Sequence, residues 1–238
     1  MQLIETVTVA QIAANSLAAV RVFEKYGIDY CCGGKRPLAD VCRDKGYNPE
    51  VIQAELDGAA AGNQERERDW TTAPLSDLIE YIVGRHHDYL RGEFPGLQSR
   101  LDKVYRVYNQ RYGPALLGLP EVFGALRSEL ESHIRKEEVI LFPAIVAFEE
   151  VVRSGRQPNL PLTGLSELIR TMESEHSIAG DALTKIREIT ANFALPEYAC
   201  VTYRALMSGL EELEHDLHLH IHLENNILFP RAERLETA

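Results

Sequence analysis

The amino-acid sequence predicts an all-α protein in which a small N-terminal helical domain precedes an antiparallel four-helix bundle. Two observations lead to this fold class. Apolar residues recur at helical spacing through four long segments, whereas β-branched runs that alternate with a period of two are scarce. Proline and glycine mark the short breaks between the long segments. Four long helices with short connections are typical of an antiparallel bundle.

The N-terminal region contains three shorter helical patterns. They cover residues 8–14, 16–26 and 37–57. The tract GAAAGNQERERD at 58–69 is small and polar and is predicted to be a linker. We therefore expect an N-terminal domain over residues 1–60, a linker over 61–72 and the four-helix bundle over 73–238.

The four long segments form the predicted bundle, because each carries an apolar stripe with the spacing of an amphipathic helix. They cover residues 74–112, 119–153, 162–191 and 197–235. The breaks between them read GPALLGLP, SGRQPNLP and NFALPE. Pro95 lies inside the first segment, where we expect it to kink the helix rather than end it, because the apolar pattern resumes at Leu97.

Composition excludes several classes of protein. The formal net charge of -11 argues against a nucleic-acid-binding surface, which needs a basic face. No stretch of about 18 uninterrupted apolar residues is present, so we expect no membrane span. The N-terminus lacks a basic region followed by an apolar one, which predicts no signal peptide and a cytoplasmic protein.

The most informative feature is a repeated pattern, H-x-x-x-E-x-x-I-L-F-P. It reads HIRKEEVILFP at 133–143 and HIHLENNILFP at 220–230. Each copy places a histidine and a glutamate four residues apart in an apolar helix, where a charge is costly to bury. Phe142 and Phe229, in the two LFP copies, are expected to seal this region against water.

Helical rotation of about 100° per residue predicts which side chains face the core. In the fourth helix the inward stripe holds Leu213, Leu217, His220, Glu224 and Ile227. The second helix repeats these steps with Leu126, Leu130, His133, Glu137 and Ile140. The third helix has Leu165, Ile169, Met172, His176, Ala179 and Leu183. His215, His218 and His222 rotate away from this face and are expected to meet water.

The first helix leaves its inward histidine open. Its apolar stripe, which includes Ile79 and Leu90, centres on His86. His87 lies four residues after Val83 and three before Leu90, so it could also turn inward. Periodicity alone slightly favours His86.

Four inward histidines and two inward carboxylates predict a metal site. Burying so many polar groups without a cation would cost several kcal/mol or more. Imidazole with carboxylate suits iron, and also zinc or manganese. Six ligands, two of them glutamates able to bridge, indicate two metal ions rather than one structural zinc. The His-x-x-x-Glu spacing differs from the Glu-x-x-His spacing of ferritin-like bundles.

The repeat resembles the hemerythrin-like domain, in which the HxxxE…LFP pattern recurs on the second and fourth helices. This resemblance covers about residues 74–235. YCCGGK at 30–35 follows the helix SLAAVRVFEKYGID, and this order resembles the N-terminal ScdA-type domain of the iron–sulfur cluster repair di-iron family. Similarity to that family then runs over essentially the whole chain, through DYCCGGK, HHD, SHIRKEE, MESEH and HLENNILFP.

The resemblance implies a non-haem centre of two iron ions, oxo- and carboxylate-bridged. In this family the first-helix ligand is the histidine directly before Asp, which selects His87 over His86. The implied ligands are His87, His133, Glu137, His176, His220 and Glu224. A hemerythrin oxygen carrier would have five histidines on its irons. Four histidines leave more open coordination, which suggests reactivity rather than simple carriage.

The implied function is repair of iron–sulfur clusters damaged by oxidative and nitrosative stress, by iron donation, by reaction with nitric oxide, or by both. The implied partners are damaged iron–sulfur proteins and the diatomic ligands nitric oxide and dioxygen. The resemblance is also compatible with a nitric oxide reductase-type activity and with a homodimer. The alternative is a hemerythrin-like module that binds or senses oxygen or nitric oxide while its N-terminal domain docks a partner.

Cys31 and Cys32 are the candidate catalytic residues of the N-terminal domain. Two glycines and two cations follow them, and cations with a helix N-terminus would lower the thiol pKa. We expect a reactive or metal-binding pair that helps to move iron or electrons between the domains, and the alternative is a tight turn with partly buried thiols. Cys42 and Cys200 fall on helical patterns and are expected in the core.

Overall fold

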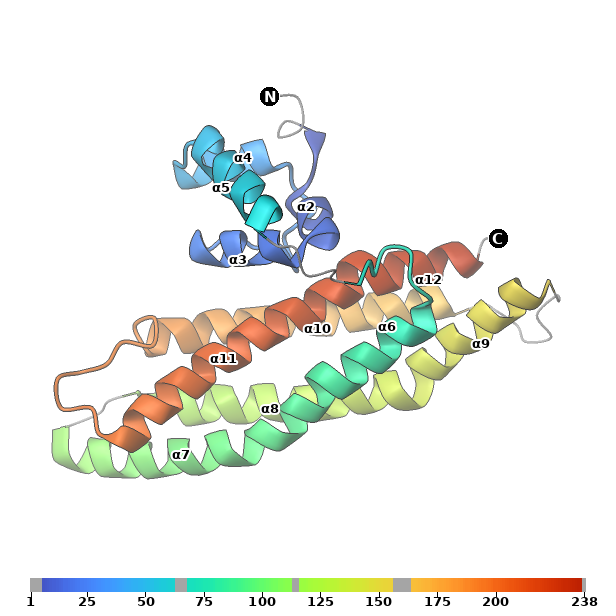
Figure 1. Ribbon diagram of the computed structural model, residues 1–238. Coiled ribbons are helices and arrows are strands. Elements are labelled where there is room, and N and C mark those ends of the chain that lie inside the picture. The colour runs from blue at the N-terminus through green and yellow to red at the C-terminus, as the bar shows by residue number, and fades with distance from the viewer. Residues whose placement is uncertain (1–5, 63–67, 113–115, 156–163, 237–238) are drawn as a thin grey trace. The chain divides into compact units, whose positions relative to one another are not determined.

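The computed structural model describes residues 6–62, 68–112, 116–155 and 164–236 (Figure 1). These residues form helices joined by turns, and the β-bridge found among them is an isolated pair, Thr8 with Pro37. The predicted all-α fold is confirmed. The chain divides into two compact units, of which one takes in Met1–Ile79, Phe148–Gln157 and His218–Ala238 and the other Glu80–Ala147 and Pro158–Leu217.

Local sequence signals set the short N-terminal helices of the first unit. These are α2 (Val9–Asn15), α3 (Leu17–Lys25), α4 (Leu38–Lys45) and α5 (Pro49–Gly62). Thr8 and Gln11 form a capping box at the start of α2, and the Ser16 hydroxyl caps α3. The pattern predicted as one helix over 37–57 is two helices, because Gly46 ends α4 in a left-handed conformation with φ 70°.

The helix α5 also continues to Gly62, so the tract predicted as a linker begins as helix. Residues 63–67 of that tract lie outside the described residues.

The four long helices are confirmed, each close to its expected ends. They consist of α6 (Leu75–Ile82), η1 (Val83–His87) and α7 (Asp88–Tyr112); α8 (Leu119–Lys136), η2 (Glu137–Leu141) and α9 (Phe142–Ser154); α10 (Leu165–Ile189); and α11 (Val201–Leu223), η3 (Glu224–Leu228) and α12 (Phe229–Glu236). As expected, α7 continues through Pro95.

The second unit is an antiparallel four-helix bundle built from α7, α8, α10 and the first part of α11 (Figure 1). Phe94 and Phe123 meet edge to face between α7 and α8, and α8 packs along α10. The helices α10 and α11 are joined by an ion pair of Arg187 with Glu214. Gly209 lets α11 approach α7 closely, because a Cβ atom there would lie 2.8 Å from the Leu97 side chain.

In the first unit, α3 packs against α5 and α2 packs against η3. The Glu149 carboxylate accepts a hydrogen bond from the backbone N–H of Leu75 at the start of α6. The Arg231 guanidinium donates to the carbonyl oxygens of Trp70 and Ala73, each at 2.6 Å. These side-chain contacts to the backbone fix the segment that leads into the first long helix.

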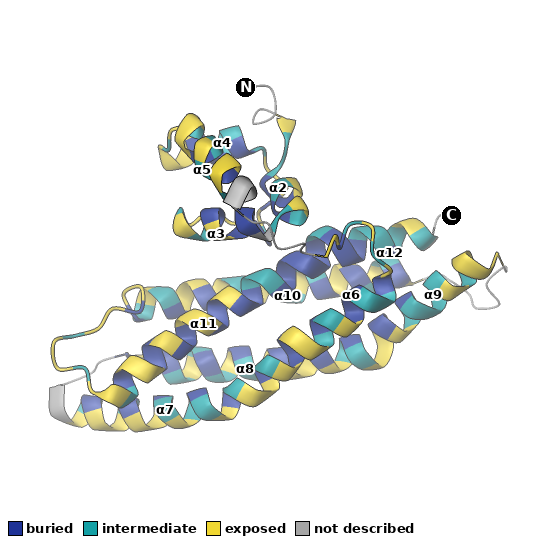
Figure 2. Cartoon of the chain, viewed as in Figure 1, coloured by how far each residue is buried: buried dark blue, intermediate teal, exposed yellow. Residues whose placement is uncertain are grey.

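The junction of α11 and η3 is buried around its whole circumference. Six consecutive residues, 220–225, are all buried, whereas the first part of α11 alternates between buried and exposed residues (Figure 2). A helix that is buried all round has neighbours on every face. Among the described helices, none combines the length and apolarity that crossing a lipid bilayer requires.

Candidate metal centre

Three of the long helices contain a π-helical turn, and each turn carries a predicted metal ligand. His87 ends η1, Glu137 begins η2 and Glu224 begins η3. In each turn the backbone N–H of the following residue bonds to the carbonyl five residues earlier. Such turns are rare and occur mostly at functional sites. Each adds one residue to a helical turn, so the side chains that follow it rotate by roughly 100° from the α-helical pattern.

This rotation explains two differences from the sequence pattern. Ile140, expected in the core, is 50% exposed, and the next residue, Leu141, is buried instead. In the first helix His86 and His87 are both fully buried, because the π-turn that ends at His87 brings neighbouring positions inside. A helical wheel with constant rotation cannot anticipate either result.

His87 and His86 have different partners. The His87 Nε2 atom lies 3.4 Å from Glu137 Oε2, and the His87 ring stacks on Phe142 with 5.7 Å between ring centroids. His86 instead places Nδ1 3.0 Å from an Asp216 carboxylate oxygen. The structure therefore brings His87, rather than the histidine favoured by periodicity, to the predicted glutamate.

The second and third helices supply the next potential ligands. The His133 Nε2 atom lies 3.3 Å from Glu137 Oε1 and 3.0 Å from His176 Nε2. On the fourth helix, His220 Nε2 lies 3.0 Å from Glu224 Oε1, one helical turn away. All five of these residues are at most 2% exposed.

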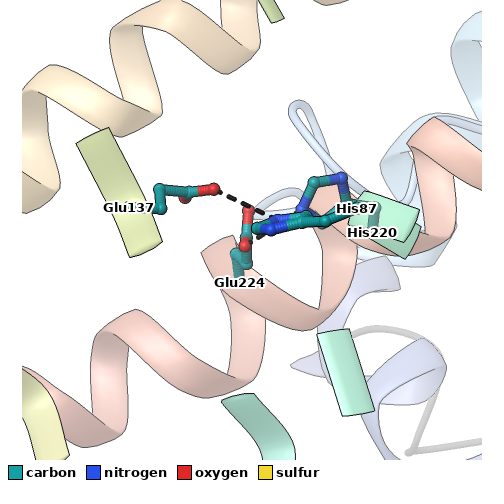
Figure 3. A group of neighbouring side chains, drawn as sticks. All are labelled: His87, Glu137, His220 and Glu224. Atoms are coloured by element: carbon teal, nitrogen blue, oxygen red, sulfur yellow. Dashed lines mark hydrogen bonds and ion pairs between the residues drawn. The ribbon is translucent and has the colours of Figure 1, made fainter. Parts of the chain in front are cut away.

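The six predicted ligands form two overlapping groups. One group contains His87, Glu137, His220 and Glu224 (Figure 3), and the other contains His133, Glu137, His176 and Glu224. Within each group, one potential ligand atom per residue lies within 4.8 Å of every other. Both glutamates belong to both groups. This is the arrangement in which two cations would share two carboxylates.

The donor atoms fit metal ions. His87 and His133 each turn Nδ1 toward a carboxylate, Glu138 or Glu175, at 2.8 Å. A proton on Nδ1 leaves a lone pair on each Nε2, and both lone pairs face the Glu137 carboxylate. A lone pair and an anionic oxygen repel each other unless a cation lies between them. Carboxylates that orient histidine ligands through the other ring nitrogen are typical of metal centres.

Glu138 and Glu175 were not among the residues predicted from the sequence. Burial would raise the pKa of the Glu138 carboxyl, but hydrogen bonds from Arg91 and His87 outweigh it and hold this pKa below its ordinary value. For Glu175 burial is likewise outweighed, here by Lys136 and His133, and the pKa is lowered. Each glutamate directly adjoins a predicted ligand in the sequence, since Glu138 follows Glu137 and Glu175 precedes His176. This adjacency is the sequence signal that could have identified them.

The expected exposure of the other histidines holds only in part. His215 is exposed, His218 is half-buried, and His222 is fully buried, so the prediction that His222 meets water is wrong. The Tyr30 ring covers this face edge-on, 5.4 Å from the His222 ring and 6.2 Å from the His218 ring. Burial lowers the pKa of His222 to about 4.

Cys31 and Cys32 lie in a tight turn ordered by Asp29. The Asp29 carboxylate accepts hydrogen bonds from the backbone N–H groups of Cys31, Cys32 and Gly33 at 2.8–3.0 Å. Cys31 is buried, Cys32 is partly exposed, and their sulfur atoms are 3.7 Å apart. The predicted adjacent pair is therefore held with one thiol inside and one near the surface.

The expected lowering of the thiol pKa is wrong for Cys31. A hydrogen bond with Cys32 and burial, together with the Asp29 charge, raise the pKa of the Cys31 thiol well above its ordinary value. Arg36, one of the expected cations, pairs with Asp44 at 2.6 Å instead. Of the other two cysteines, Cys42 is buried as expected, whereas Cys200 is exposed because it precedes α11 rather than lying within it.

Two family models match successive parts of the chain. The model of the hemerythrin HHE cation binding domain matches residues 78–232, and the model ScdA_N, described as a domain of unknown function (DUF542), matches residues 5–60. The iron-sulfur cluster repair protein YtfE of Escherichia coli (strain K12 / DH10B) is 41% identical over 223 residues, which cover 93% of this chain and 94% of YtfE. YtfE of Shigella boydii serotype 4 (strain Sb227) matches with the same identity and coverage.

These matches span both the cysteine turn and the helices that carry the His/Glu groups. The chain belongs to the family of hemerythrin HHE proteins that includes the iron–sulfur cluster repair protein YtfE.

Proposed function

We propose that this protein repairs iron–sulfur clusters damaged by oxidative and nitrosative stress, and that its cofactor is a pair of iron ions, oxo- and carboxylate-bridged. The observation that carries the proposal is the sharing of Glu137 and Glu224 by two groups of potential ligands. The identity to proteins named for iron–sulfur cluster repair supports iron over zinc or manganese.

In this proposal the ligands are those predicted from the sequence. The two irons would supply iron that can be released, and they would also supply redox chemistry toward nitric oxide and dioxygen. The side chains of the chain prepare the site. Glu138 and Glu175 fix the orientation of His87 and His133, and the buried Phe142 ring covers the His87 ring against water. Four neutral imidazoles and two carboxylates do not cancel the charge of two iron ions, which favours anionic ligands at the remaining positions.

The proposed division of labour assigns the metal centre to a domain over residues 73–238 and the thiols to a domain over 1–60, joined by the segment 61–72. Cys31 and Cys32 would assist the movement of iron or electrons, with damaged iron–sulfur proteins of the cytoplasm as partners. The second candidate, a module that binds or senses oxygen or nitric oxide, is favoured by one observation. The Cys31 thiol is buried and its pKa is raised, which disfavours a constantly reactive nucleophile.

The test compares iron content and repair in three forms of the purified protein. The wild type should bind two irons per chain and restore activity to an iron–sulfur enzyme inactivated by nitric oxide. Glu224→Leu should lose iron and repair together. Glu212→Leu, an exposed position on the same helix, should keep both.

Two results would redirect the proposal. Two irons retained in Glu224→Leu would contradict the shared-carboxylate site. Reversible nitric oxide binding by the wild type, without any reactivation of the damaged enzyme, would support the sensing module instead.

A further inference from the structure

The face of α11 and η3 that carries His222 and Asn226 is covered by the backbone of the cysteine turn. The Asn226 side-chain amide donates to the carbonyl oxygens of Tyr30 and Cys31, at 3.2 and 3.3 Å. The same amide lies 3.0 Å from His222 Nδ1, which in turn is 3.3 Å from the Tyr30 oxygen. Two side chains of one helical segment therefore hold the peptide that bears Cys31.

The chain packs closely against the Tyr30 carbonyl oxygen at position 34. A Cβ atom on Gly34 would lie 2.6 Å from this oxygen and 3.0 Å from the Ala10 side chain, so only glycine fits there. The Gly34 carbonyl itself accepts a hydrogen bond from the Ala10 backbone. The turn is thus closed on one side by α2 and on the other by His222 and Asn226, and it cannot move while these contacts persist.

The residues that hold the turn alternate with potential metal ligands. His222 lies between His220 and Glu224, and Asn226 follows Glu224 by two positions within the π-turn η3. Two positions along a helix turn a side chain by roughly half a revolution, in a π-turn as in an α-helix. One face of the π-turn therefore places Glu224 in the His/Glu groups, and the opposite face places Asn226 against the turn that holds Cys31 and Cys32.

We propose that His222 and Asn226 are positioning residues that couple metal occupancy to the exposure of the Cys31 thiol. Glu137 and Glu224 belong to both His/Glu groups, and their potential ligand atoms lie within 4.8 Å of each other. Cations bound by both carboxylates would tie η3 to the segment that carries Glu137, and removal of the cations would break that link. Displacement of η3 moves the Asn226 amide away from the Tyr30 and Cys31 carbonyls and releases the turn. The inference rests on the proposed function for the presence of iron and the role of the thiols.

The experiment measures the alkylation rates of Cys31 and Cys32 by iodoacetamide at one fixed alkaline pH, with mass spectrometry to separate the two sites. In the wild type, removal of iron by a chelator should accelerate alkylation of Cys31 by about tenfold, because two hydrogen bonds of this kind contribute roughly that factor to the local opening equilibrium. Asn226→Leu with iron bound should react at the fast rate, and iron removal should change it no further. Asn226→Gln, which keeps the amide, should recover part of the iron dependence.

The matched control is Arg231→Met. It also removes two hydrogen bonds from a side chain near the C-terminus to backbone carbonyls of an earlier segment, but those carbonyls belong to Trp70 and Ala73. Its Cys31 rates should equal those of the wild type with and without iron. Equal Cys31 rates in iron-loaded and iron-free wild type would overturn the coupling.

A second measurement decides the case in which Asn226→Leu does not fold. Amide hydrogen exchange of residues 31–33 in the wild type should be faster without iron, and unchanged exchange would overturn the inference. Neither readout needs a repair assay, so loss of repair with intact coupling would count against the proposed function alone.

Discussion

At the scale of single residues, the chemistry of the centre depends on which atom of each histidine is left to meet a cation. His133 has both ring nitrogens buried, and the sequence assigns neither of them. The nearby Glu175 carboxylate, 2.8 Å from Nδ1, favours the tautomer with the proton on Nδ1, which donates to Glu175. The lone pair then lies on Nε2, which faces Glu137. A carboxylate outside the predicted ligand set therefore determines the tautomer of His133.

Replacement of Glu175 tests this dependence. Glu175→Gln keeps the shape but removes the charge, so His133 can turn over and present the wrong nitrogen. We expect the affinity for iron to fall about 10- to 100-fold with little change in fold. Iron titration under anaerobic conditions measures it, and Glu167→Gln, exposed on the same helix, is the control. An unchanged affinity in Glu175→Gln would show that Glu175 serves only its ion pair with Lys136.

The two kinds of thiol should differ in their response to pH. The raised pKa of Cys31 keeps this group protonated at neutral pH, and its alkylation should increase as pH rises beyond 9.0, the ordinary value. Cys200 is an internal control, because a hydrogen bond with Tyr108 and the backbone N–H of Tyr203 lower its pKa and it is exposed. Its alkylation should level off at lower pH. Cys31 reacting as readily as Cys200 at neutral pH would contradict the burial and the Asp29 contact.

At the scale of helices, the sequence predicts the number, order and approximate ends of the long elements, and it fails where the rotation per residue changes. His220, Glu224 and His176 face inward as the wheel predicts. His86, His87 and Ile140 lie in π-turns, whose extra residue leaves no mark in an apolar pattern. The burial of His222 could not be predicted either, because the helix is covered on its outer face by residues far away in the sequence.

The π-turn η2 has a direct consequence for tolerance to substitution. With α-helical rotation Ile140 would lie in the core, but in the structure it is half exposed while Leu141 is buried. We expect Ile140→Lys to change the free energy of unfolding by less than about 0.5 kcal/mol, as surface substitutions do. Leu141→Ala should cost about 2–5 kcal/mol. Chemical denaturation of both variants measures the difference, and the reverse order of costs would mean that the helix is regular there.

At the scale of the whole molecule, the potential ligands come from all four long helices, and both His/Glu groups share the same two carboxylates. Spacing in the sequence shows that each pair lies one turn apart on a helix, but not that Glu137 and Glu224 meet. Burial of both carboxylates disfavours the folded chain unless cations offset their charge. Folding and metal binding are therefore expected to be linked. Without metal, the buried ligands should destabilise the fold.

This linkage predicts that the order of stabilities reverses when iron is removed. The double variant Glu137→Leu/Glu224→Leu should be less stable than the iron-loaded wild type, since metal at 100 times its dissociation constant contributes about 2.7 kcal/mol. Without iron the double variant should be as stable as the wild type or more stable, because apolar residues in place of buried charges are often neutral or favourable. Thermal unfolding with and without chelator measures all four states. A double variant that loses the same stability in both conditions would mean that the two glutamates support the fold through their packing, and that no cation is needed between them.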